Sequence, residues 1–149
     1  MKLFPVPKTG LHVALRLRDE HCPPHVHVES SAALWEARFE FSYVGNKVGL
    51  MDIDPINAAP TIRTIDAIRR AIAGHLPKCR QAWWEKIGTC CLDRRWVAID
   101  NCAVTVLARH QRNARQIRTA YYGAADGSLA LHFAEPDDHR MLAGEGIDP

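Results

Sequence analysis

The sequence predicts an α+β fold: an antiparallel β-meander of about four strands, covered by two helices and followed by a small β-rich C-terminal extension. Apolar and polar residues alternate with a period of two through most of the first 53 residues, which is typical of half-buried strands. Apolar residues then recur at spacings of three and four, as on one face of a helix. Short apolar, β-prone runs return after residue 95.

The predicted strands of the meander are 11–18, 25–29, 34–44 and 47–53. Gly45-Asn46 is a two-residue hairpin sequence. Strand 34–44 has an aromatic-rich face, which is either a platform for stacking nucleic-acid bases or a sheet face beneath a helix. We favour the second interpretation because the helices that follow need a surface to cover. The residues of this face are Trp35, Ala37, Phe39, Phe41 and Tyr43.

Two helices are predicted after the meander. Pro60-Thr61 begins the first, and Gly74 and Pro77 end it. Pro77 begins the second, which runs to about residue 87 with Trp83 buried. The apolar face of the first helix consists of Ile62, Ile65, Ile68, Ile72 and Leu76. The helices are also basic, which predicts a solvated face or, alternatively, contacts to phosphates; these residues are Arg63, Arg69, Arg70, Lys78 and Arg80.

We divide the chain into a domain of residues 1–88, a β-rich extension of residues 89–134 and a loose acidic tail of residues 135–149. The extension has short β-prone runs at 96–99 and 103–108, and a hairpin formed by 117–122 and 128–134. Residues 109–118 are the most basic window, so this window is either an RNA-binding surface or a solvated strand and loop.

The strongest chemical pattern lies between Asp19 and Glu29, where three of the eight histidines occur in Asp-Glu-His-Cys-Pro-Pro-His-Val-His-Val-Glu. The two prolines stiffen the backbone ahead of His25. The alternation that follows predicts a strand with His25, His27 and Glu29 on one face and two valines in the core.

Three interpretations of this face are open. The histidine pair is suited to a transition metal such as zinc, with His25, His27 and His21 as ligands and Glu29, Cys22 or Asp19 as further ones. Alternatively, the two histidines exchange protons during RNA cleavage, Glu29 orients one imidazole, and Arg16 or Arg18 binds phosphate. The third interpretation is structural: half-exposed strand histidines that bond to carbonyls and carboxylates.

The segment Arg18-Asp19-Glu20-His21-Cys22-Pro23-Pro24-His25-Val26-His27-Val28 resembles the signature of a bacterial family, domain of unknown function 4160. The resemblance extends over about residues 1–88, because Trp83-Trp84-Glu85-Lys86 is similar to the family's helical tail. Cys22 stands where the family usually has asparagine, which argues against a shared role for this cysteine. The resemblance implies a component of a toxin–antitoxin type system, encoded beside a second small protein.

Charge, cysteine spacing and missing motifs restrict the possible functions and the location of the protein. A net charge of +2 offers no bulk electrostatic argument for binding nucleic acid. The five cysteines show no Cys-x-x-Cys spacing, and vicinal Cys90 and Cys91 are poorly placed to bridge each other. With no secretory segment or membrane span in the sequence, we expect a cytoplasmic protein with reduced thiols and no membrane contact. Motifs of nucleotide and serine hydrolysis are absent from the sequence.

The resemblance implies a toxin–antitoxin-type protein, and the histidine face favours one that cleaves RNA with His25 and His27, by acid–base or metal-assisted chemistry. The alternative is a non-catalytic protein-binding module, such as an antitoxin-like partner or an inhibitor. The near-neutral charge and the incomplete catalytic set motivate this alternative. We expect a protein partner, with RNA as the candidate nucleic acid; the identity of the metal and the oligomeric state stay open.

Overall fold

The computed structural model describes residues 1–134 and 139–142. Its first sheet has five antiparallel strands in chain order, β1-β2-β3-β4-β5. Their bounds are β1 Lys2–Pro5, β2 His12–Ala14, β3 His25–Ser30, β4 Trp35–Glu40 and β5 Gly49–Asp54. A 3-10 turn, Ile56–Ala58, leads from β5 into helix α1, Ile62–Ala73, and helix α2 follows as Leu76–Ile87.

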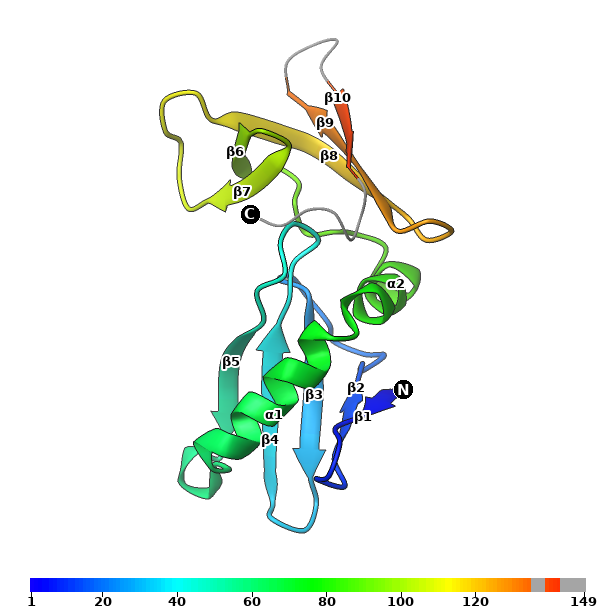
Figure 1. Cartoon of the computed structure of the whole chain (residues 1–149), viewed down its shortest axis with the longest axis vertical. Helices are drawn as coiled ribbons and strands as arrows, with labels where there is room; N and C mark the ends of the chain where they lie inside the picture. Colours follow the sequence, from blue (N-terminus) through cyan, green and yellow to red (C-terminus); the bar gives the residue numbers. More distant parts are fainter. Residues whose placement is uncertain (135–138, 143–149) are drawn as a thin grey trace.

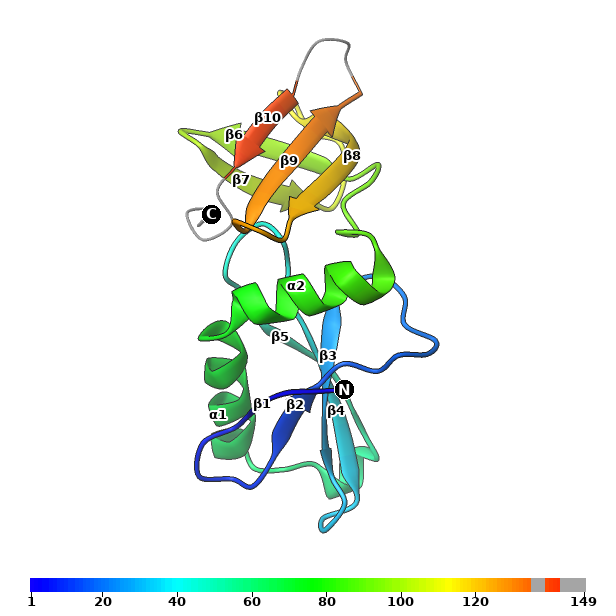
Figure 2. The ribbon, with the colours of Figure 1, turned by 90° about the vertical axis from the view of Figure 1, so that its right-hand side faces the viewer.

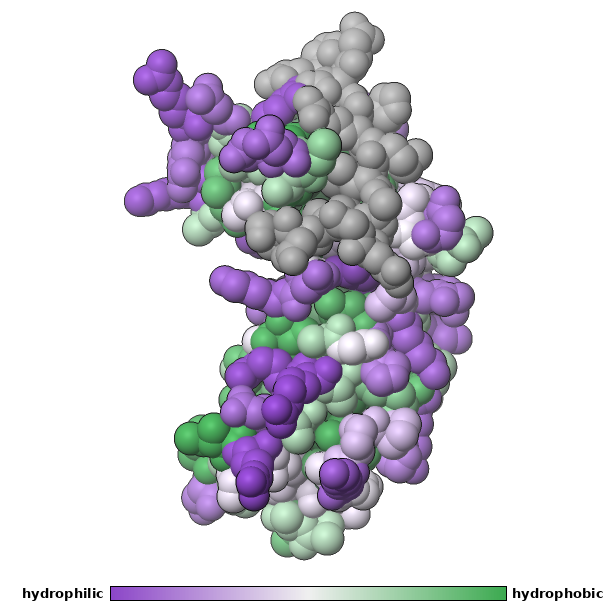
Figure 3. Space-filling view, viewed as in Figure 1, coloured by the Kyte–Doolittle hydropathy of each residue, from purple (hydrophilic) through white to green (hydrophobic). Residues whose placement is uncertain are grey.

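The two helices occupy different places on the first sheet. Helix α1 lies along one face, whereas α2 crosses the end of the sheet and separates it from the second sheet (Figures 1 and 2). Thr61 caps α1, because its side chain accepts a hydrogen bond from the backbone amide of Thr64. Hydrophilic side chains gather over α1 in Figure 3, and Arg63 and Arg70 are exposed there, as the basic helical pattern predicts.

The aromatic-rich strand face is buried, which confirms that it belongs to the core. Trp35 retains 6% of its exposure, and Phe39, Phe41 and Tyr43 retain 1% or less. The inner face of α1 contributes Ile68 and Ile72 to the same apolar cluster. Because this face is dry, stacking of nucleic-acid bases on it is excluded.

The second sheet contains β6 Trp96–Asp100, β7 Ala103–Leu107, β8 Arg115–Gly123, β9 Ser128–Phe133 and β10 His139–Leu142. Its order is β10-β9-β8-β6-β7, and every pairing is antiparallel. The α+β fold class is thus confirmed, with the β-rich extension as a sheet of its own. The tail expected over 135–149 lies outside the described residues except for His139–Leu142, which form β10 rather than a loose segment.

Several local predictions differ from the structure. Strand β1 was not expected, because its short proline-broken sequence shows no clear alternation. The expected Gly45-Asn46 hairpin is instead a longer connection, since β4 ends at Glu40 and β5 begins at Gly49. Leu76, which was expected on the apolar face of the first helix, is instead the first residue of α2. Arg80 is buried at 2% exposure rather than solvated, because its guanidinium donates to backbone carbonyls.

The expectation of fully reduced thiols is wrong for two of the cysteines. Cys22 and Cys91 form a disulfide across a sequence separation of 69, a proximity that cysteine spacing could not reveal. Cys90 is free, in agreement with the prediction that it does not bridge Cys91. None of the helices in the described part of the chain has the length and apolarity needed to cross a membrane.

Candidate metal centre

Strand β3 presents two histidines on the sheet face opposite α1. Val26 and Val28 are fully buried on the α1 side, so alternation turns His25 and His27 to the other side, as predicted. Both histidines are buried, with 1% and 4% of their exposure left, rather than half-exposed as the structural interpretation proposed. The indole of Trp83 packs against the His25 ring at a centroid distance of 5.2 Å.

The connection between β2 and β3 folds over this face and brings Glu20 onto the two imidazoles. Glu20 Oε1 lies 3.0 Å from His27 Nε2, and Glu20 Oε2 lies 3.2 Å from His25 Nε2. The Glu20 side chain is only 4% exposed. One potential ligand atom from each of the three residues lies within 4.8 Å of the others.

A backbone carbonyl assigns the tautomer of His25, whereas the His27 ring lies between two carboxylates. His25 Nδ1 lies 2.8 Å from the carbonyl oxygen of Pro23, which can only accept, so this nitrogen carries the proton. His27 Nδ1 lies 3.0 Å from Glu36 Oε1, and an ionised carboxylate likewise only accepts. In the neutral ring, His25 Nε2 therefore presents its lone pair to Glu20 Oε2, whereas His27 Nε2 lies at hydrogen-bond distance from Glu20 Oε1, at 3.0 Å.

Glu36 is held ionised by its neighbours. Burial acts to raise the pKa of its carboxyl, but hydrogen bonds from His27 and Arg16 outweigh burial, and the net effect lowers the pKa. Arg16 also donates to Glu29 at 2.7 Å, and this hydrogen bond is the main cause of the raised pKa of the Arg16 guanidinium. A charged network of Glu36, Arg16 and Glu29 therefore lies on the Nδ1 side of the His27 ring.

The three inner groups offer atoms that could hold a metal ion together. Glu20 Oε2 is buried and, within the described residues, accepts no hydrogen bond. The Glu20-to-imidazole distances of 3.0 and 3.2 Å are close to the spacing of about 3.3 Å between ligand atoms in a tetrahedral site with bonds of about 2.0 Å. Neutral imidazoles and a carboxylate at this spacing need a cation between them, either protons or a metal ion.

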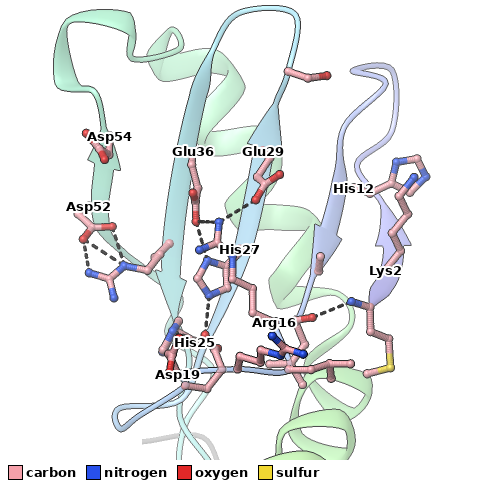
Figure 4. A pocket seen from close by; sticks show the side chains of 18 of the residues that line it. Lys2, His12, Arg16, Asp19, His25, His27, Glu29, Glu36, Asp52 and Asp54 are labelled. Carbon is pink, nitrogen blue, oxygen red and sulfur yellow. Dashed lines mark hydrogen bonds and ion pairs between the residues drawn. The ribbon is translucent and has the colours of Figure 1, made fainter.

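The cluster lies in the wall of an open cleft of about 1080 Å³ on this sheet face. Arg16, Glu29 and Glu36 meet beside His27, while Asp52 and Asp54 extend from β5 at the cleft's far edge (Figure 4). Lys2, His12 and Arg18 also line the cleft. A substrate in this space would thus meet both the histidine cluster and cationic side chains.

The predicted site residues divide into two groups. His25 and His27 lie in the cluster, whereas His21 is exposed, with its ring centroid 6.2 Å from that of His25. Glu29 contacts Arg16, and the carboxylate at His27 Nδ1 belongs to Glu36 instead. Arg16 binds Glu29 and Glu36, while Arg18 and Asp19 line the cleft. Cys22 is in the disulfide.

Sequence reasoning did not identify Glu20 or Glu36 as members of the site. The hairpin register could have found Glu36, because β3 and β4 pair with Glu29 opposite Glu36 and His27 opposite Arg38. Cross-strand neighbours share a sheet face, so Glu36 is diagonal to His27. Glu20 had no comparable pattern, since it reaches the imidazoles from an irregular connection. Comparisons with protein-family models, curated proteins and solved structures found no match to this chain.

Proposed function

We propose that this protein binds a divalent transition metal, such as zinc, through His25, His27 and Glu20, and uses it to hydrolyse phosphodiester bonds in RNA. The convergence of two imidazole Nε2 atoms on the two oxygens of one buried carboxylate carries this proposal. Two histidines and one carboxylate are a known ligand set for catalytic zinc, and they leave a coordination position for water or substrate.

The surroundings of the cluster support a hydrolytic role. The Pro23 carbonyl and the Glu36 carboxylate receive the Nδ1 protons, which is the usual way in which proteins orient histidine ligands. A metal in this site would supply a bound water with a lowered pKa, the nucleophile of metal-assisted hydrolysis. Lys2 and Arg18 line the same cleft and make no ion pair within the described residues, so they are available to phosphate.

A second function is favoured by one observation, the depth of the cluster. The side chains of Glu20, His25 and His27 are 4%, 2% and 5% exposed, which suits a structural metal that fixes the β2–β3 connection. In that case the protein is a non-catalytic binding module. The resemblance to a toxin–antitoxin family is compatible with either function. We still expect the protein to be located in the cytoplasm and to bind a protein partner.

Metal binding is tested by titrating the metal-free protein with Zn²⁺ in a calorimeter. We expect one zinc ion per chain and at least a 100-fold loss of affinity in His27→Ala and Glu20→Gln. His12→Ala is the matched control, because His12 is an exposed histidine of the same cleft, and its affinity should equal that of the wild type. Equal zinc affinity in all four proteins would refute the site.

Hydrolysis is tested by incubating zinc-loaded wild type, His12→Ala and Arg18→Ala with a labelled single-stranded RNA. Cleavage by wild type and His12→Ala, with a higher KM in Arg18→Ala, would support the hydrolase. Zinc binding without cleavage would overturn the hydrolase and favour the binding module. Thermal unfolding with and without zinc would then show whether the metal stabilises the fold.

A further inference from the structure

The connection between β2 and β3 supplies two separate parts of the metal centre. It provides Glu20 as a ligand, and it provides the Pro23 carbonyl that orients the His25 ring. Cys22 stands between these two residues and is joined by the disulfide to Cys91, just beyond α2. The disulfide cross-link between this connection and the later part of the described chain therefore lies inside the ligand-bearing segment.

The rest of the connection has few other anchors. Within the described residues, the backbone of 16–22 makes no hydrogen bond to other backbone groups, whereas the Pro24 carbonyl accepts from the amide of Phe41. The side chain of Arg16 is bound to Glu29 and Glu36, so the segment is fixed at its start and just after its end. Between these points, the disulfide, the edge contact of the His21 ring with His25 and the contacts of Glu20 itself position the ligand.

The disulfide is open to reagents in solution, whereas two neighbouring thiols are not. Cys22 is exposed and Cys91 is partly exposed. Cys79 and Cys90 are buried, and burial raises the pKa of each thiol to about 12, which disfavours the reactive thiolate. Exposed disulfides are the labile ones, and disulfides of cytoplasmic proteins usually respond to redox conditions. Thiol exchange should therefore occur at Cys22–Cys91 rather than in the interior.

We infer that the Cys22–Cys91 disulfide controls metal affinity, so that its reduction frees the Glu20 segment and weakens binding at Glu20, His25 and His27. This inference rests on the proposed metal centre. A dithiol supplies two electrons and two protons; the disulfide becomes two cysteine thiols, and the dithiol becomes its own disulfide. His25 and His27 stay on β3, but Glu20 must then be ordered at the moment of binding, and this cost lowers affinity.

The test compares zinc affinity in oxidised and reduced full-length protein. One sample is reduced with dithiothreitol, alkylated with iodoacetamide at its accessible thiols and freed of both reagents, so that the cysteines neither bind zinc nor reoxidise. A Cys22→Ser/Cys91→Ser double variant provides an independent form without the disulfide. Cys102→Ser is the matched control, because Cys102 is an exposed free cysteine and the disulfide persists in this variant.

We expect zinc affinity to fall at least tenfold in the reduced, alkylated protein and in the double variant, and to stay unchanged in Cys102→Ser. Mass spectrometry confirms the modification of Cys22 and Cys91, and circular dichroism confirms that the fold persists. Affinities within twofold of the oxidised wild type in both forms would overturn redox control while leaving the metal centre intact. Failure of the oxidised wild type to bind zinc would overturn the metal centre, and redox control of metal affinity with it.

Discussion

At the scale of single residues, the candidate metal centre depends on which ring nitrogen carries the proton. The Pro23 carbonyl accepts from His25 Nδ1, and the Glu36 carboxylate lies 3.0 Å from His27 Nδ1, while both Nε2 atoms lie beside the Glu20 carboxylate. The Pro23 carbonyl and the Glu36 carboxylate would each act on the metal only indirectly, through the histidine that they contact. Such positioning groups should affect metal affinity less than the ligands do.

Glu36→Ala tests this positioning role. Loss of the acceptor at His27 Nδ1 should weaken zinc binding about 10- to 100-fold, because outer partners of this kind fix the orientation and basicity of a histidine ligand. Glu40→Ala, at an exposed glutamate of the same strand, should bind as the wild type does. Calorimetric titration measures both variants, and equal affinities would show that Glu36 does not support the site.

At the scale of elements, the sheet face around the site is held by pairs of opposite charge across neighbouring strands. Arg38 on β4 faces Asp52 on β5 in the strand register, and its Nε donates to Asp52 Oδ1 at 2.9 Å. The hydrogen bond from Arg38 is the main cause of the lowered pKa of the Asp52 carboxyl, whose ordinary value is 3.8. The Asp52 side chain is 46% exposed, so solvent screens this pair.

The pH dependence of this pair has a definite sign. Because the pKa of Asp52 is lower in the folded state, the pair stabilises the protein above the ordinary pKa of the carboxyl and stops doing so as the pH falls through the lowered value. Asp52→Asn should therefore lower the free energy of unfolding by about 0.5 kcal/mol near pH 6, and this difference should vanish once the pH has fallen below the lowered pKa of Asp52. Urea unfolding of both proteins measures the difference; one that grows on acidification would contradict the assignment.

The elements also show what the sequence could and could not predict. Periodicity identified β3, β4 and α1, and the Pro77 start signal identified α2. Alternation also predicted that His25 and His27 share one face, because it follows directly from strand geometry. Glu20 was not predicted, because an irregular connection has no period. The disulfide that anchors this connection joins residues 69 positions apart, and only the tertiary fold brings them together.

At the scale of the whole molecule, α2 connects the site to the second sheet. Its Trp83 packs on His25, while Arg80 donates through Nε to the Ser42 carbonyl at 2.9 Å and through Nη2 to the Gly45 carbonyl at 2.7 Å. The ring of Tyr43, in the connection between β4 and β5, meets the ring of Tyr122 on β8, with their centroids 5.0 Å apart. Arg80 thus holds α2 against the connection between β4 and β5.

Arg80→Met tests how much this connection contributes to stability. Methionine fills part of the volume but leaves the Ser42 and Gly45 carbonyls without these donors in a buried region. We expect the free energy of unfolding to fall by about 2 to 4 kcal/mol, as measured by urea denaturation. Lys78→Met, at an exposed position of the same helix, should change it by less than about 0.5 kcal/mol. Equal stability of the two variants would show that Arg80 is not a structural anchor.

The proposed metal centre requires that Glu20, His25 and His27 bind one metal ion together. X-ray absorption spectroscopy of the oxidised, zinc-loaded protein tests it most directly. We expect two imidazole nitrogens at about 2.0 to 2.1 Å, further oxygen ligands at about 2.0 to 2.2 Å and no sulfur, with one imidazole contribution lost in His27→Ala. A sulfur shell at about 2.3 Å, or a spectrum unchanged by His27→Ala, would contradict it.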